Sequence, residues 1–203
     1  MPVFSLPELQ RKAAVIRTHE SALFKKTASQ VLTESSLSFS EKPGYDVFLS
    51  HSFRDAHFIL ALKMDLEGMN YSVYVDWLVD SQLDRSKVSK DTADLLRRRM
   101  KSCRSLFIVH SENSQASKWV PWELGFFDGM KGRVAVLPIV NTEFPDDRYY
   151  GVEYMALYPY VTKAKNQATN KETLWIHDSE NYYVHFDAWL GGNAPIYHER
   201  YTR

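Results

Sequence analysis

YDVFLSHSFRD, residues 45–55, decides the fold class. Its first six residues are a short run rich in β-branched and aromatic side chains, which predicts a strand, and a polar loop leads from it into a helix that ends at Gly68. Three more strands are predicted, at SVYVD (72–76), LFIVH (106–110) and VAVLPIV (134–140). Segments with helical spacing alternate with these runs, at 55–68, 90–102 and 119–130. Buried-type strands that alternate with helices are typical of an α/β protein, with a parallel sheet covered by helices on both faces.

The segments on either side of this pattern are less regular. Apolar residues recur at helical spacing through 6–33, which predicts one long helix or two shorter ones for packing or oligomerisation, and a Ser/Pro/Gly linker follows at 37–44. In the tail, Thr173–Ile176 and Tyr182–Phe186 resemble strands, although Phe186–Leu190 could instead begin a short helix. We therefore expect three parts: a helical arm and linker at 1–44, a central domain at 45–165, and an extension at 166–203 that packs on the core.

Composition excludes several classes of protein. The 203 residues include 25 Lys and Arg against 25 Asp and Glu, so the net charge is zero. A dedicated binder of nucleic acid or acidic membrane would have a basic excess, and we expect neither partner. The single cysteine, Cys103, excludes an internal disulfide and a Cys-rich zinc site. No apolar run approaches the roughly 18 residues that span a bilayer, and the N-terminus does not resemble a signal peptide, so we expect a cytoplasmic protein.

Familiar ligand motifs are absent from the sequence. There is no GxGxxG, GxxxxGK[ST] or GxSxG, and no His or carboxylate cluster has the spacing of a metal site. A receiver domain is excluded because Ser50-His51 and His110-Ser111 stand where that fold needs an acid pair and a phospho-acceptor Asp. We therefore expect no metal and no resident cofactor.

Ligands of open parallel sheets bind outside the carboxyl ends of the strands, which directs attention to the polar loops there. Once the motifs above are excluded, one pair of candidate residues remains. Trp119 and Glu123 are four residues apart at the start of a predicted helix, so they share one helix face. A Glu in a first turn is also favoured by the helix dipole, so spacing alone leaves a structural role open.

Four segments resemble the Toll/interleukin-1 receptor (TIR) domain family, in the order and at the spacing of that family. They are YDVFLSHS (45–52), SVYVD (72–76), SKWVPWEL (117–124) and VAVLPI (134–139). The third is similar to the W-x-x-x-E-L segment of TIR proteins that cleave NAD. The resemblance covers about 45–140 and extends weakly to about 165. It implies a flavodoxin-like parallel sheet flanked by helices.

The resemblance also implies a site. The essential glutamate of the W-x-x-x-E motif falls on Glu123, and NAD+ would be the substrate rather than a cofactor. The NAD-binding residues that the family pattern implies are Ser50, His51, Ser52, Phe53, Arg54, Asp76, Trp77 and Trp119. Among these, Arg54 suits a phosphate, Asp76 a ribose hydroxyl, and the tryptophans a flat cationic or adenine ring.

Structural interpretations compete at several positions. Asp55 reads as a helix cap, His110 as the end of a strand, and Cys103 as a small buried side chain. The basic run Arg97–Lys101 reads as a solvated helix face, with a patch for another subunit or for NAD phosphates as the alternative. The sequence also departs from the family, because the loop 77–89 has no glycine and Pro121 lies inside the W-x-x-x-E motif, where only a first helical turn tolerates it.

The resemblance leaves three functions open, and they belong to different classes of protein. The first is an NAD+ glycohydrolase or ADP-ribosyl cyclase, similar to the TIR component of bacterial Thoeris anti-phage systems. Its partners would be other TIR subunits and a separate effector protein that senses the product. The second is a non-catalytic adaptor that acts by TIR–TIR contact, and a host-mimicking effector is a further reading. The pairing of Trp119 with Glu123 favours the enzyme.

Overall fold

The computed structural model describes residues 1–24, 44–75, 89–114, 117–146 and 148–199; for 17–24 and Phe53 only the backbone is described. The helices are α1 (Leu6–Phe24), α3 (Ala56–Gly68), α5 (Lys90–Ser102), α6 (Trp119–Lys131) and α7 (Phe186–Leu190), with 3-10 turns η1 (Phe53–Asp55) and η3 (Glu153–Leu157). The strands are β1 (Phe4–Ser5), β2 (Tyr45–Ser50), β3 (Val73–Tyr74), β4 (Cys103–His110), β5 (Val134–Val140), β6 (Tyr160–Lys165), β7 (Glu172–Ser179), β8 (Tyr182–His185) and β9 (Ile196–Tyr197).

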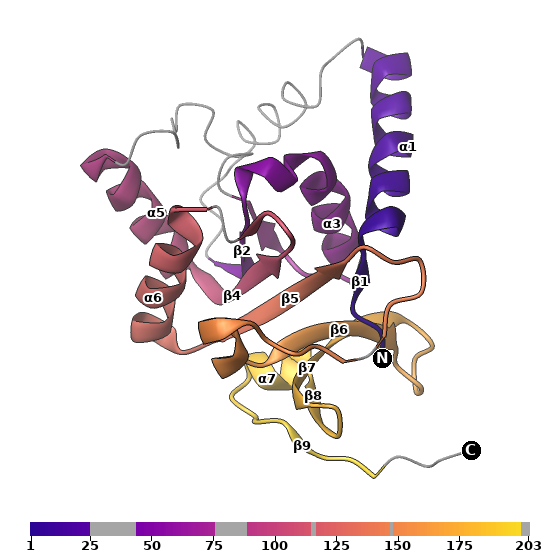
Figure 1. Cartoon of the computed structure of the whole chain (residues 1–203), viewed down its shortest axis with the longest axis vertical. Coiled ribbons are helices and arrows are strands. Elements are labelled where there is room, and N and C mark those ends of the chain that lie inside the picture. The colour runs from indigo at the N-terminus through magenta and orange to yellow at the C-terminus, as the bar shows by residue number, and fades with distance from the viewer. Residues whose placement is uncertain (25–43, 76–88, 115–116, 147, 200–203) are drawn as a thin grey trace.

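One sheet runs through the molecule in the order β3-β2-β4-β5-β6-β7-β8-β9 (Figure 1). Neighbours from β3 to β6 are parallel, whereas β6 to β9 pair antiparallel. The order of the parallel strands is that of flavodoxin-like doubly wound sheets, so the predicted α/β class is confirmed. The sequence did not indicate that the antiparallel strands belong to the same sheet.

Two apolar clusters, one on each face of the sheet, explain why these strands form. Successive residues of a strand point to opposite faces. Val47 and Leu49 join the cluster that includes α1, α3 and α7, whereas Phe48 joins the cluster that includes α5 and α6. The expected helices on both faces are therefore present. In α6 the predicted first-turn position of Pro121 is confirmed, and Gly132 ends the helix with a left-handed φ of 62°.

The N-terminal segment enters the sheet, which the sequence did not indicate. β1 pairs parallel with β5, with Phe4 opposite Ile139, and the Lys163 N–H donates to the Pro2 carbonyl at 3.1 Å. The segment therefore lies against both β5 and β6 (Figure 1). Helix α1 then packs on α3. Residues 25–33 of the predicted helix and 37–43 of the predicted linker lie outside the described residues.

A group of four ionic side chains ties α1 to its neighbours. Lys163 on β6 contacts both carboxylate oxygens of Glu8 at 3.0 and 3.1 Å, and Lys12 contacts Glu8 at 2.8 Å and Asp65 on α3 at 2.6 Å. Lys163 is only 8% exposed. A buried ion without its partner is costly, so these contacts specify where the arm lies. The predicted boundaries between the arm, the central domain and the extension, at residues 44 and 165, stay predictions.

The tail packs on the same core. Phe186 is fully buried against Tyr71 and Phe107, and Leu174 and Ile176 are buried beside it. The tail strands predicted at 173–176 and 182–186 correspond to β7 and β8, and the alternative helix at Phe186–Leu190 is α7. No helix among the described residues is long and apolar enough to cross a bilayer.

Candidate active site

Two predicted site residues, Ser50 and Glu123, meet at the carboxyl edge of the parallel sheet. Ser50 is the last residue of β2, and Glu123 lies in α6, which follows β4. The Ser50 hydroxyl donates to Glu123 Oε2 at 2.5 Å, although the two residues are 73 positions apart. Both side chains are buried, and Glu123 is 0% exposed. The contact fixes one oxygen of the carboxylate.

Local sequence explains why α6 presents Glu123 here. The Ser117 hydroxyl accepts the Val120 N–H at 3.3 Å, which satisfies one donor of the first turn. Pro121 lacks an N–H and fits a first turn without losing a bond. Glu123 is two residues further on and points toward the sheet, because α6 buries Val120, Leu124 and Phe127 on the same side.

Trp119 lies one turn before Glu123 but points into the core. It is 5% exposed, and its ring meets Trp122 edge-on at 5.4 Å between centroids. Trp122 in turn stacks on Phe126 and has the Arg97 guanidinium 5.3 Å from its ring centroid. Among the described residues, a cation therefore lies over the ring of Trp122. A substrate contact by Trp119 stays a prediction.

The loop after β2 is turned largely into the protein. His51 is 0% exposed and its Nδ1–H donates to the Leu49 carbonyl at 3.0 Å. Ser52 is 3% exposed, whereas Arg54 is exposed at the surface. Of Phe53 only the backbone is described. Asp76 and Trp77 lie outside the described residues, as does most of the loop 77–89 that departs from the family pattern.

Asp55 corrects a sequence-based prediction. It stands at the N-cap position of α3, but with φ −90° and ψ 0° its side chain makes no capping hydrogen bond. Its carboxylate instead accepts from the Ser111 hydroxyl at 2.6 Å and from the Asn113 amide at 2.8 Å. Helix capping is a local rule, and here a long-range contact replaces it. The signal was available, because both loops follow neighbouring strands at the carboxyl edge.

The sequence assigned structural roles to His110 and Cys103, and the contacts of both residues agree with those roles. His110 ends β4 as predicted, and its Nδ1 shares a 2.7 Å hydrogen bond with the Tyr149 hydroxyl. Burial lowers the pKa of His110 and raises the pKa of Tyr149 to about 12, so both are neutral near pH 7. Cys103 is buried as predicted, and burial raises the pKa of its thiol to about 12. A thiol with that pKa is a poor nucleophile.

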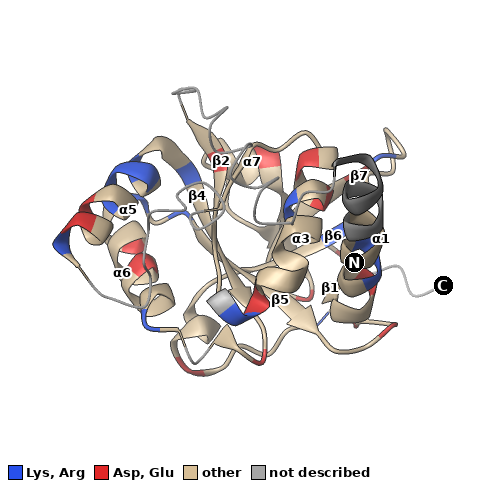
Figure 2. Ribbon diagram, turned by 90° about the horizontal axis from the view of Figure 1, so that it is seen from above, with Lys and Arg blue, Asp and Glu red and all other residues tan. Residues whose placement is uncertain are grey.

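The predicted basic helix face is α5, where Figure 2 shows Lys and Arg side by side with acidic residues. Arg97 pairs with Asp94 on the same helix at 2.7 Å, and Arg98 and Lys101 are exposed. This pattern agrees with a solvated face; its alternative role as a docking patch stays a prediction.

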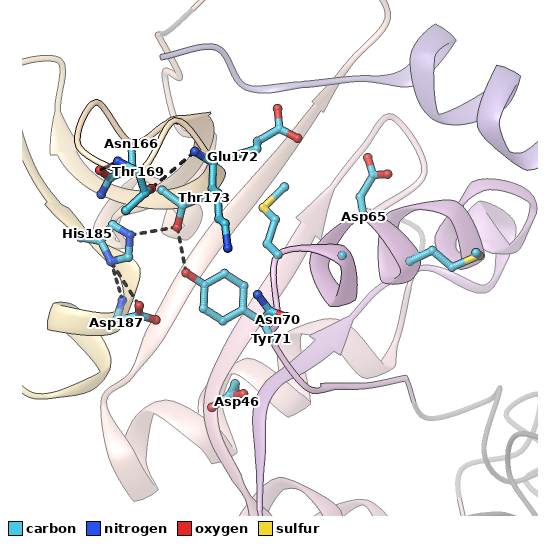
Figure 3. A pocket seen from close by; sticks show the side chains of 14 residues that line it. Asp46, Asp65, Asn70, Tyr71, Asn166, Thr169, Glu172, Thr173, His185 and Asp187 are labelled. Atoms are coloured by element: carbon cyan, nitrogen blue, oxygen red, sulfur yellow. Dashed lines mark hydrogen bonds and ion pairs between the residues drawn. The ribbon is translucent and has the colours of Figure 1, made fainter.

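A large cavity of about 900 Å³ lies at the other edge of the sheet, lined by the start of β2, the end of α3 and the β6–β7 turn (Figure 3). Its wall contains a hydrogen-bonded relay in which Thr173 Oγ1 lies 3.0 Å from the Tyr71 hydroxyl and 2.9 Å from His185 Nε2. Asp46 at this cavity and Ser50 are at opposite ends of β2. Because parallel sheets bind ligands at their carboxyl edge, we assign the candidate active site to Ser50 and Glu123 rather than to this larger space.

Comparison with known proteins agrees with the fold. Residues 47–171 match the family model described as TIR domain. The chain belongs to the TIR domain family.

Individual relatives extend the comparison. The chain is 52% identical over 168 residues to "Probable 3' cyclic ADP-D-ribose synthase ThsB'" of Bacillus cereus (strain MSX-D12), an alignment that covers 83% of this chain and 86% of that protein. It is 34% identical over 109 residues to "Putative cyclic ADP-D-ribose synthase TIR2" of Cytobacillus dafuensis, covering 53% of this chain and 29% of that protein. Among solved structures, the TIR domain of the Toll-related receptor TRR-2 from Hydra magnipapillata matches 56% of this chain and 78% of that one, with 16% identity and a TM-score of 0.38.

Proposed function

We propose that this chain cleaves the bond between nicotinamide and ribose in NAD+ and forms a cyclic ADP-ribose. The observation that carries the proposal is the Glu123 carboxylate, held by Ser50 at the carboxyl edge of a TIR domain. The printed name of the 52% identical relative, a cyclic ADP-D-ribose synthase, supports the product class.

A lone carboxylate suits this chemistry. When the C1′–N bond breaks, its electron pair goes to the nicotinamide nitrogen, which is already cationic and so leaves as a neutral molecule. The leaving group needs no general acid, unlike that of an ordinary glycoside. Glu123 stabilises the positive charge that develops on the ribose. Capture by a hydroxyl of the same molecule, with loss of a proton, closes a ring; capture by water gives ADP-ribose.

We propose two kinds of role for the other predicted site residues: one residue orients Glu123, and the others contact NAD+. Ser50 orients Glu123, since its hydroxyl already donates to that carboxylate. Arg54 is exposed and suits the diphosphate. For His51, Ser52, Phe53, Asp76, Trp77 and Trp119 the proposed contact with NAD+ rests on the family pattern.

Substrate access requires movement. Glu123 is 0% exposed, so the side chains over it must shift before NAD+ can reach the carboxylate. We propose that association with other copies of the chain accompanies this opening. The turnover per subunit then rises with protein concentration.

The biological setting is part of the proposal. A cyclic nucleotide-like product suits a signal, and we propose that a separate effector protein senses it in bacterial anti-phage defence. NAD+ is a cytoplasmic metabolite, which supports the cytoplasm as the compartment.

The test is chromatography with mass detection of NAD+ incubated with concentrated protein, beside the Glu123→Gln variant. We expect nicotinamide and a cyclic ADP-ribose from the wild type, and neither from the variant. Equal release from both proteins would remove Glu123 from the mechanism. No release by the wild type at any concentration, including in lysate of phage-infected cells, would favour a non-catalytic scaffold.

A further inference from the structure

Asp55 is a buried carboxylate that joins two loops of the carboxyl edge. It is 0% exposed, and each of its side-chain oxygens accepts a hydrogen bond from the loop after β4: Oδ2 from Ser111 and Oδ1 from Asn113. A carboxylate taken out of water needs such partners, and bonds to a charged acceptor are among the stronger ones. The contact between the two loops therefore depends on Asp55 in one loop and on Ser111 and Asn113 in the other.

The loop that Asp55 binds leads directly into the helix that contains Glu123. The Asn113 N–H donates to Ser111 Oγ at 3.1 Å, and Ser114 donates to the Ser111 carbonyl through its N–H at 3.1 Å and its hydroxyl at 2.8 Å. The Ser117 N–H then donates to the Ser114 carbonyl at 3.2 Å. These turns determine where α6 begins, and with it the position of Glu123.

Asp55 also belongs to the loop that begins at Ser50. Its own N–H donates to the Ser52 carbonyl at 2.9 Å. The two loops are consequently joined twice, once by Ser50 to Glu123 and once by Asp55 to Ser111 and Asn113. Two separate ties fix both distance and rotation, whereas either alone would leave a hinge.

We propose that Asp55 is a positioning residue for NAD+ cleavage, which holds α6 and the 50–54 loop in the arrangement that catalysis requires. The inference rests on the proposed function and adds a residue that does not touch substrate, because both of its carboxylate oxygens already accept hydrogen bonds from the protein. It also explains why Asp55, at the N-cap position of α3, makes no capping hydrogen bond.

The Asp55→Asn variant tests the tie with little change in shape. One oxygen becomes an amide group, which can still leave an acceptor for Ser111 but turns a donor toward the donor of Asn113. We expect kcat for nicotinamide release to fall about 10- to 100-fold, with KM changed less, because misplaced catalytic groups lose rate more than binding. The double variant Asp55→Asn/Asn113→Asp restores one donor and one acceptor and should recover most of kcat. Glu112→Gln, an exposed change in the same loop, is the matched control and should behave as wild type.

Hydrogen exchange measured by mass spectrometry gives a readout that does not need turnover. For Asp55→Asn we expect faster exchange in peptides covering 111–114 and 117–123, with the first turn of α3 unchanged. Faster exchange at the start of α3 alone would mean that Asp55 acts as a helix cap. An unchanged kcat in a folded, active variant would mean that the hydrogen bonds of Asp55 do not position the site. Either result overturns the proposal. If wild type and Glu112→Gln both release no nicotinamide, the proposed function fails, and the exchange pattern alone decides whether Asp55 ties the loops.

Discussion

The two edges of the parallel sheet differ, because one has a cluster of buried polar side chains and the other has a large cavity. At the carboxyl edge, polar side chains are buried and bonded to one another, with Ser50 on Glu123 and Asp55 on the loop after β4. At the amino edge lies the open cavity of about 900 Å³ (Figure 3). The proposed active site lies at the compact edge, so under this proposal the volume of a cavity does not identify the site of the reaction.

The polar groups of the amino edge have a structural explanation. Tyr71, which precedes β3, reaches Thr173 on β7, and Thr173 reaches His185 at the end of β8. The relay thus joins the parallel part of the sheet to its antiparallel extension. Burial raises the pKa of Tyr71 to about 12, so its hydroxyl stays protonated and available for this contact.

The largest expected effect separates the edges by activity. Glu123→Gln should lower the rate of nicotinamide release by at least about 100-fold, because the developing charge loses its carboxylate. His185→Ala, in the cavity, should leave that rate within about twofold of wild type, since distant sites act independently. Steady-state assays on both variants check this. The reverse pattern would move the active site to the cavity.

A smaller loss is expected from Ser50→Ala. Without the hydroxyl, Glu123 keeps its charge but loses the bond that orients it, so kcat should fall about 10-fold. Thermal unfolding measured beside the assay separates this effect from loss of folded protein. A variant with a higher KM and an unchanged kcat would instead assign Ser50 to substrate binding.

The amino edge should respond in stability rather than activity. Tyr71→Phe removes the hydroxyl from Thr173 and should lower the free energy of unfolding by about 1 kcal/mol, a typical net value for one hydrogen bond. Urea unfolding of the variant measures this loss. A marked fall in nicotinamide release at equal folded fraction would contradict a purely structural relay.

The smallest expected effect is an acid dependence at Asp46. Burial raises the pKa of its carboxyl, but hydrogen bonds from Ser72 and Arg104 outweigh it, and the net pKa lies below its ordinary value. A carboxyl with a lowered folded-state pKa stabilises the protein above the unfolded-state pKa, near 4, and loses this contribution as pH falls through the folded-state value. The difference in Tm between wild type and Asp46→Asn should therefore shrink below about pH 4. A constant difference from pH 6 to pH 3 would show that the carboxylate charge is irrelevant there.

Sequence predicted the regular centre of the molecule well because local signals agreed there. The strands at 45–50 and 134–140 and the helix at 90–102 match the structure residue for residue. β1 escaped prediction because two residues have no periodicity, and it forms only through pairing with β5.

The site shows the same division between local and long-range information. Resemblance to the family predicted Glu123 as the essential residue, and spacing placed it on a helix face. Its bond with Ser50 joins positions 73 apart, and the role of Asp55 depends on a loop 56 residues away. Only the folded sheet brings these groups together, so the sequence predicted Asp55 as a helix cap. The resemblance predicted Ser50 as a substrate contact, which stays a prediction.

The most direct test of the central claim is where NAD+ binds. Hydrogen exchange of Glu123→Gln, with and without saturating NAD+, would map the site in a protein expected not to consume its ligand. We predict slower exchange in peptides covering 50–54 and 117–124, with no change in 166–173 or 185–187. Protection at those last two segments, and none at the carboxyl edge, would contradict the assignment of the active site to Ser50 and Glu123.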